Sequence, residues 1–303
     1  MGNYFVQYSH LFKAFCFTDE QVEECRQNME VAMLELRDDD YKFMGLDVPA
    51  PDAPIVALLM GREYNSYASD WNYVRALAKT GVRIRFITYD TPIPQMFGCD
   101  GLVLPGGSFK SPEEFYVDAN MEGGDVISER AMAYMNCINC AVADGMPILG
   151  ICAGAQMVAG MFRMKLIRDT KQFKGAMNHK SEAIYAHDVD IIPGTMLAKL
   201  LFNLKRMKVN SRHTEMLAPR EMQLPFFFSK EKHSNADVNS LQLPLDYYAM
   251  SGDGVPEAWG SEAKKILCIQ WHPEDFCVLG DAMMQRIYGW LADKARDYKK
   301  SRE

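Results

Sequence analysis

The stretch Gly150-Ile151-Cys152-Ala153-Gly154 stands between an apolar run, residues 146–151, and a helical pattern over residues 153–162. Glycines around a reactive residue let a strand pass into a helix through a tight turn, which exposes the nucleophile at the carboxyl edge of a sheet. The positive end of the following helix favours a thiolate over a thiol. The pattern predicts a nucleophile elbow built on cysteine, although the pentapeptide alone fits a small packed cysteine equally well.

Strand and helix patterns alternate along the rest of the chain. Short apolar runs predict buried strands, and amphipathic periodicity predicts the helices between them. This alternation implies a parallel sheet with right-handed crossovers, whose ligands collect at the carboxyl ends of the strands. We expect strands at residues 55–60, 82–88, 101–104, 146–151, 188–192, 207–210 and 266–270, helices at 69–79, 126–144, 153–162, 195–202 and 281–298, and a hairpin from 247–250 and 257–259.

A histidine and a carboxylate follow the last predicted strand, in Trp271-His272-Pro273-Glu274. Pro273 biases His272 toward an extended backbone, in which residues two apart project to the same side. The carboxylate of Glu274 can therefore lie along the imidazole of His272. If this strand neighbours the one before Cys152, the three side chains form a Cys-His-Glu triad with His272 as the base.

A Pro105-Gly106-Gly107 turn ends the strand predicted at residues 101–104. Glycines at a strand's carboxyl end let backbone N–H groups approach a developing oxyanion closely. We expect the amides of Gly107 and Ala153 to be these donors. Pro-Gly-Gly alone is a common turn, so its significance depends on the other motifs.

The three motifs together resemble the class I glutamine amidotransferase superfamily, in that family's order. The resemblance covers roughly residues 54–298, and it implies a flavodoxin-like α/β fold in three layers with a mostly parallel central sheet. It also implies a catalytic domain over residues 53–303. The matching motifs are Leu104-Pro105-Gly106-Gly107, Gly150-Ile151-Cys152-Ala153-Gly154-Ala155-Gln156 and Gln270-Trp271-His272-Pro273-Glu274.

Three further passages, residues 72–81, 209–213 and 251–258, resemble the gamma-glutamyl hydrolase branch, including bacterial gamma-glutamyl-GABA hydrolases. This resemblance implies a hydrolase that cleaves a gamma-glutamyl amide through a thioester on its nucleophile, without a cofactor. The triad carries over as Cys152 the nucleophile, His272 the base and then acid, and Glu274 the orienting group. The substrate contacts that it implies are Gly106, Gln156 and His213.

Two departures from that branch make an unusual substrate conceivable. Ala153 stands where the branch often carries arginine, and Thr214-Glu215 replaces a Gly-Gln or similar pair. Two other functions stay open. The alternatives to a gamma-glutamyl hydrolase are a glutaminase subunit that delivers ammonia to a separate synthase, and a catalytically silent binding or regulatory homologue.

Two segments lie outside the family pattern. Residues 1–52 read as an N-terminal extension, with a capping box at Thr18-Asp19-Glu20-Gln21 that opens a helix over residues 19–36, and with a proline-rich linker. Asp38-Asp39-Asp40 is expected to end that helix. Residues 218–246 read as an insertion or lid. Either segment could bind a protein partner, and a homodimer is left open.

Composition excludes several other classes. The chain has 303 residues and a formal charge of −7, and its basic residues are scattered, which argues against a nucleic-acid partner. No apolar run reaches the roughly 20 residues that span a bilayer, so we expect no membrane partner. Eight cysteines without a leader pattern indicate a reducing cytoplasm.

No metal site is expected from the sequence. Cys137-Ile138-Asn139-Cys140 lacks the second cysteine pair or histidine pair that would complete a tetrahedral site, so we expect both cysteines to pack in the core. The remaining histidines have no recognisable ligand partners and are interpreted as surface or satisfied residues: His10, His179, His187 and His233.

Overall fold

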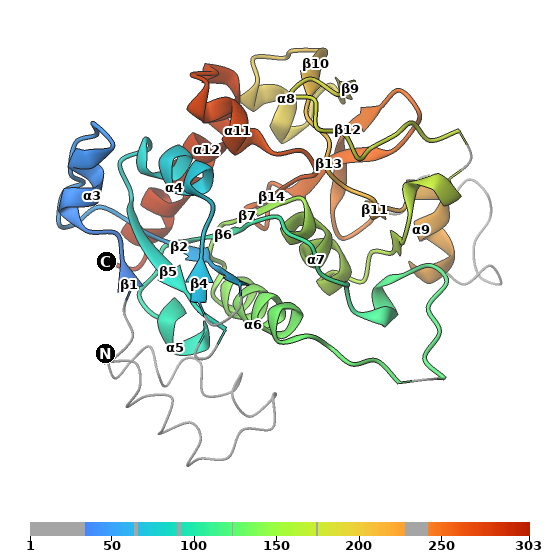
Figure 1. Ribbon diagram of the computed structural model, residues 1–303, viewed down its shortest axis with the longest axis horizontal. Coiled ribbons are helices and arrows are strands. Elements are labelled where there is room, and N and C mark those ends of the chain that lie inside the picture. The colour runs from blue at the N-terminus through green and yellow to red at the C-terminus, as the bar shows by residue number, and fades with distance from the viewer. Residues whose placement is uncertain (1–33, 64–65, 90–91, 123, 174, 228–241) are drawn as a thin grey trace.

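The computed structural model describes residues 34–63, 66–89, 92–122, 124–173, 175–227 and 242–303. These residues form a ten-stranded sheet with helices on both faces (Figure 1). Its strands, in spatial order, are β1 (Leu34–Glu35), β5 (Arg83–Ile87), β2 (Ile55–Leu59), β6 (Gly101–Leu104), β7 (Ile148–Ile151), β14 (Ile266–Ile269), β13 (Pro256–Ser261), β12 (Asp246–Ser251), β9 (His187–Ile191) and β10 (Arg206–Val209).

The helices of the described residues are α3 (Asp38–Phe43), α4 (Trp71–Ala78), α5 (Pro92–Met96), α6 (Glu129–Asp144), α7 (Ala153–Met161), α8 (Met196–Leu200), α9 (Arg220–Phe227), α11 (Pro273–Val278) and α12 (Ala282–Lys300). Two small sheets pair β3 (Gly61–Glu63) with β4 (Ser66–Ala68) and β8 (Leu166–Ile167) with β11 (Met216–Leu217). None of these helices is both long and apolar enough to cross a bilayer.

The three-layer α/β fold is confirmed. The strands β5, β2, β6, β7 and β14 pair in parallel, as their helical connections require, whereas β13, β12, β9 and β10 extend the sheet by antiparallel pairing. The expected hairpin is β12 and β13. The sheet is therefore parallel around the predicted elbow and antiparallel beyond β14.

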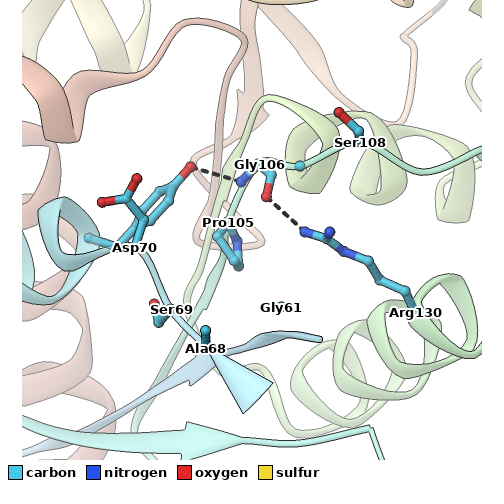
Figure 2. A pocket seen from close by; sticks show the side chains of 10 residues that line it. Gly61, Ala68, Ser69, Asp70, Pro105, Gly106, Ser108 and Arg130 are labelled. Carbon is cyan, nitrogen blue, oxygen red and sulfur yellow. Dashed lines mark hydrogen bonds between the residues drawn. The ribbon is translucent and has the colours of Figure 1, made fainter. Parts of the chain in front are cut away.

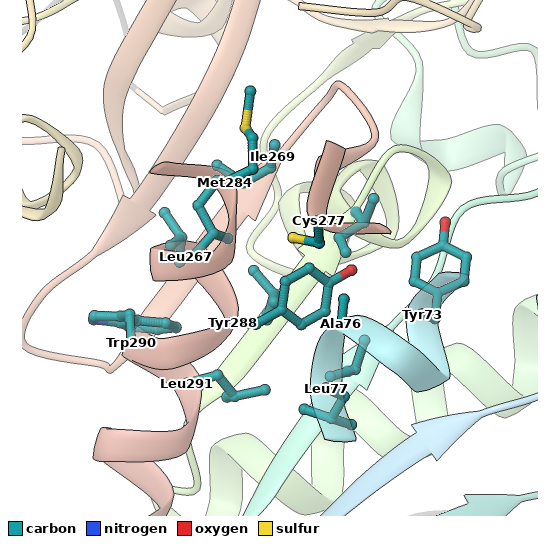
Figure 3. Packing of buried hydrophobic residues seen from close by; sticks show 14 of the residues in the cluster. Tyr73, Ala76, Leu77, Leu267, Ile269, Cys277, Met284, Tyr288, Trp290 and Leu291 are labelled. Carbon is teal, nitrogen blue, oxygen red and sulfur yellow. The ribbon is translucent and has the colours of Figure 1, made fainter. Parts of the chain in front are cut away.

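Alternate residues of the central strands pack into two separate cores. In β2, Val56 and Leu58 belong to the cluster under α4 and α12, whereas Ala57 and Leu59 belong to the cluster that includes α6 and α7 residues. Figure 3 shows the first cluster, where Tyr288 of α12 lies beside Ala76 of α4. Burial on both faces explains why these strands are apolar throughout.

The N-terminal segment differs from the expectation. Residues 1–33 lie outside the described residues, but the predicted helix does not reach residue 36, because Leu34–Glu35 pairs antiparallel with β5. The aspartates at positions 38–40 begin α3 instead of ending a helix. Their charges are favourable at that end of a helix because the dipole there is positive.

Smaller differences concern helix starts and the proposed insertion. The helix α6 begins at Glu129 because the hydroxyl of Ser128 accepts a hydrogen bond from Ala131 N–H and caps it.

Of residues 218–246, the structure describes α9 and the approach to β12, and buried Gln223 attaches α9 to Lys165. Cys137 and Cys140 lie in the core, as expected.

Because α7 lies close to β6, replacing two helical glycines by alanine should change the free energy of unfolding in opposite directions. A Cβ at Gly154 would collide with the carbonyl of Leu104, whereas a Cβ at Gly289 in α12 would have no atom within 4 Å. We expect Gly154→Ala to lower the free energy of unfolding by about 1–3 kcal/mol. Gly289→Ala should raise it by about 0.5–1 kcal/mol. Urea denaturation of both variants checks this, and equal effects would contradict it.

Candidate active site

Cys152 lies between the end of β7 and the first turn of α7. Its backbone has φ 51° and ψ −114°, a conformation that non-glycine residues rarely adopt and that often marks functional sites. Its N–H donates to the carbonyl of Ile269 at 2.7 Å, which holds the turn against β14. A Cβ at Gly150 would lie 2.9 Å from Cα of Ala155, so the tight turn requires glycine there.

His272 and Glu274 stand just beyond β14, at the edge where β7 ends. The Nδ1 atom of His272 lies 2.6 Å from Oε1 of Glu274, whose side chain is almost fully buried. Because Nδ1–H donates to the carboxylate, Nε2 is left for Cys152. Burial acts to lower the pKa of His272, but the charges of Glu274 and Cys152 outweigh burial and raise that pKa well above its usual value.

The Pro-Gly-Gly turn is packed directly against these two side chains. A Cβ at Gly106 would lie 2.8 Å from Cε1 of His272 and 3.0 Å from Cβ of Cys152. The hydroxyl of Tyr73 accepts a hydrogen bond from Gly106 N–H at 2.9 Å and lies 3.3 Å from Nδ1 of His272. The structure therefore brings Cys152, His272, Glu274 and Gly106 together around Tyr73, which the sequence did not single out.

Arg130 of α6 fixes the orientation of the next peptide bond. Its guanidinium donates to the carbonyl of Gly106 at 2.8 Å, as Figure 2 shows, and lies 4.8 Å from the centre of the Phe109 ring. Carbonyl and N–H of one trans peptide point in opposite directions, so Gly107 N–H points away from Arg130. Gly107 has φ 153°, and a Cβ there would collide with Arg130.

The second expected donor, Ala153 N–H, is at the first position of α7. The first amides of a helix have no acceptor within the helix, so this N–H is available beside the cysteine.

Asn210 clamps the backbone of His272. Its Oδ1 accepts from His272 N–H at 2.8 Å, and its Nδ2 donates to the His272 carbonyl at 3.0 Å and to Asp275 at 3.1 Å. Asp275 also pairs with Arg212 at 2.7 Å. The loop after β10 thus positions His272 through its main chain. In the sequence this loop is recognisable only by its resemblance to the family, because a side chain that binds a distant main chain leaves no local pattern.

Gln156 and His213, the other two residues predicted to contact the substrate, point into the protein interior. Gln156 is buried, and its Nε2 donates to the carbonyl of Glu215 at 2.9 Å and to Oε1 of Gln270 at 3.1 Å. His213 is buried too, with Nδ1 bonded to the Glu215 carbonyl at 2.9 Å. Neither residue lines the cavity beside the Pro-Gly-Gly turn.

That cavity has a volume of about 550 Å³ and is lined by Ser69, Asp70, Gly106, Gly107 and Arg130, among others (Figure 2). It presents one acidic and one basic side chain next to the glycine turn.

The expectation for two histidines is wrong in part. His179 and His187 do have ligand-type neighbours, because both face the buried carboxylate of Glu257 together with His213. Sequence reasoning missed this because the four positions are far apart and form no short motif. His10 and His233 lie outside the described residues.

A strained cysteine elbow, a His-Glu pair on the neighbouring strand and a three-layer α/β sheet define a glutamine amidotransferase-like protein. The match to a family model over residues 72–274 makes the assignment specific: the chain belongs to the peptidase C26 family. This family is an enzyme class, and membership supports a glutamine amidotransferase-type or gamma-glutamyl hydrolase-like cysteine activity.

Individual relatives are distant. The glutamine amidotransferase-like protein YvdE of Lactococcus lactis is 26% identical over 58% of this chain and 66% of its own length. The gamma-glutamyl-gamma-aminobutyrate hydrolase of Escherichia coli O157:H7 is 28% identical over 58% of this chain and 64% of its own length. The chain therefore spans just under two thirds of both relatives.

A solved structure shares the fold. The CTPS glutaminase domain of Trypanosoma brucei superposes with a TM-score of 0.53 at 14% identity, over 81% of this chain and 94% of that one.

The environment of His272 predicts the effect of neutralising its partner. Glu274→Gln removes the carboxylate charge that raises the pKa of His272, whereas burial, which lowers it, remains. We expect that pKa to fall in the variant, measured by NMR titration of histidine-labelled protein.

Glu262→Gln is the matched control, since this exposed residue follows β13 at the opposite end of β14 from His272. An unchanged pKa in Glu274→Gln would show that Glu274 does not hold the imidazolium.

Proposed function

We propose that the chain is a cysteine hydrolase that cleaves a gamma-glutamyl amide bond through a thioester on Cys152. The observation that carries this proposal is the convergence of the elbow cysteine and His272 on one glycine. A Cβ at Gly106 would touch both residues, and Glu274 lies 2.6 Å from the far nitrogen of the imidazole. Such a triad activates a nucleophile and supplies a proton to a leaving group.

The reaction would proceed in two halves. The Cys152 thiolate attacks the gamma-carbonyl carbon, and the amides of Gly107 and Ala153 hold the oxyanion. His272 gives its Nε2 proton to the leaving nitrogen as the carbon–nitrogen bond breaks, which leaves a thioester. Water then loses a proton to His272 and attacks the thioester, and glutamate leaves as the carbon–sulfur bond breaks. The raised pKa of His272 suits it to the acid step.

The charges in the cavity support a gamma-glutamyl substrate. Such a group carries an ammonium and a carboxylate on its alpha carbon, and the cavity offers Asp70 to the first and Arg130 to the second. Arg130 donates to the Gly106 carbonyl and the Tyr134 hydroxyl but pairs with no carboxylate among the described residues, so its charge is available to a ligand carboxylate. The amine portion would extend toward solvent and has no assigned contacts.

A panel of gamma-glutamyl amides and free glutamine, followed by mass spectrometry of products and of the intact protein, tests the proposal. Release of an amine from a gamma-glutamyl amide, with a mass increment on Cys152, is the expected result. Turnover of free glutamine alone would favour a glutaminase that serves a synthase. No turnover, with Cys152 left unlabelled by an electrophilic glutamine analogue, would favour a silent homologue.

Cys152→Ala should abolish turnover and the mass increment, because it removes the sulfur that forms the thioester. The fold should be retained, since alanine is small enough for this buried position. Circular dichroism and product assays check both points, and full hydrolysis by the purified variant would overturn the role of Cys152.

Asp70→Asn tests the ammonium contact. Asp70 caps α4 by accepting a hydrogen bond from Asn72 N–H, and asparagine caps equally well, so the helix should persist. We expect KM for a gamma-glutamyl amide to rise roughly fivefold, because an exposed ion pair contributes at most about 1 kcal/mol.

A substrate without the alpha-amino group is the control, and wild type and variant should bind it equally. A similar loss with that substrate would contradict the assignment of Asp70.

A further inference from the structure

Four buried side chains from separate segments meet in the antiparallel half of the sheet. His187 begins β9, Glu257 lies in β13, His213 follows β10, and His179 precedes β9. The distances to Oε1 of Glu257 are 3.2 Å from Nδ1 of His179, 3.3 Å from Nε2 of His187 and 3.6 Å from Nε2 of His213. Exposure of these side chains is 6% or less.

The outer nitrogen of each imidazole faces an acceptor. His179 Nε2 lies 2.9 Å from Oδ2 of Asp253, and His213 Nδ1 lies 2.9 Å from the carbonyl of Glu215. His187 Nδ1 lies 3.2 Å from the carbonyl of Asp188. Because these acceptors require N–H donors, the single proton of each neutral ring is placed on the outside. Three inner lone pairs then point at a carboxylate.

With all three rings neutral, that arrangement lacks a positive centre. Nε2 of His187, Nε2 of His213 and both oxygens of Glu257 have no hydrogen-bond partner among the described residues, although all are buried. Each such atom costs about 1–3 kcal/mol when it is left unsatisfied. In a tetrahedral zinc site with metal–ligand distances of about 2.0–2.1 Å, neighbouring ligand atoms lie about 3.3 Å apart. Of the three distances to Glu257 Oε1, those from His179 and His187 have this spacing, and that from His213, 3.6 Å, is longer.

We propose that His179, His213 and Glu257, whose ligand atoms all lie within 4.8 Å of one another, bind one divalent transition-metal ion of the zinc class. Two positive charges would be balanced by the carboxylates of Glu257 and Asp253. Asp253 lies beside the outer nitrogen of His179, where a carboxylate commonly orients a metal-bound histidine. Histidine nitrogens and a carboxylate oxygen are donors that zinc accepts.

The ion would hold together the segment that positions His272. His213 and Asn210 belong to the same loop after β10, and Asn210 clamps the main chain of His272. A metal at this cluster would tie that loop to β13 and to the segment before β9. It would therefore support the candidate active site at a distance, without contacting the substrate.

The metal content of the full chain, purified without a metal-affinity step, tests the proposal. About one zinc per chain is expected by elemental mass spectrometry, because all three protein ligands come from one chain. Glu257→Gln and His179→Ala should lose the ion. Glu262→Gln, the same change at an exposed position of the same hairpin, should keep it, and so should Cys152→Ala.

A second measurement uses the wild-type chain alone, so that misfolded variants do not decide the result. Chelator-treated protein refilled with Co²⁺ should show the intense visible bands of a tetrahedral site without a thiolate charge-transfer band, and added Zn²⁺ should raise its melting temperature. No metal uptake, a thiolate band, or equal metal content in Glu257→Gln would overturn the proposal. These readouts do not depend on hydrolysis, so failure of the proposed function leaves them interpretable.

Discussion

The parallel pairing of β7 with β14 is the constraint on which the site depends. It sets Ile151 opposite Ile269, and the Cys152 amide continues the pairing by donating to the Ile269 carbonyl at 2.7 Å. Parallel strands end at the same edge of a sheet, so the residues that follow them are brought together although they are distant in sequence. A shift of register by one residue would move Cys152 and His272 apart and turn each strand's side chains to the wrong face.

Close approach of main chains is the second requirement. Gly150 faces the backbone of α7, Gly154 faces the carbonyl of Leu104, and Gly106 lies against Cys152 and His272. Each glycine is needed because a Cβ would occupy space that another segment fills. The strained backbone of Cys152 persists because these contacts, together with the hydrogen bond from Cys152 N–H to β14, hold the turn in this conformation.

The antiparallel extension of the sheet has a different chemistry from its parallel part. It holds polar buried groups, among them Glu257 and the side chains of three histidines, whereas the parallel strands are mainly apolar, with Arg85 of β5 as a buried charged residue. Through Asn210 this half also holds the main chain of His272. The parallel half of the sheet therefore positions Cys152 and the glycine turn, and the antiparallel half stabilises the loop that holds the main chain of His272.

The sequence by itself determined the alternating α/β pattern, the glycine-flanked Cys152, and the local pair of His272 and Glu274, because these depend on neighbours a few residues apart. It misassigned residues 34–40, where pairing with β5 and the helix dipole decided the outcome. Tyr73, Asn210, Arg130 and the histidines around Glu257 became visible only in the tertiary structure. Their contacts join segments far apart in the chain, and such contacts leave no periodicity or spacing that a sequence could display.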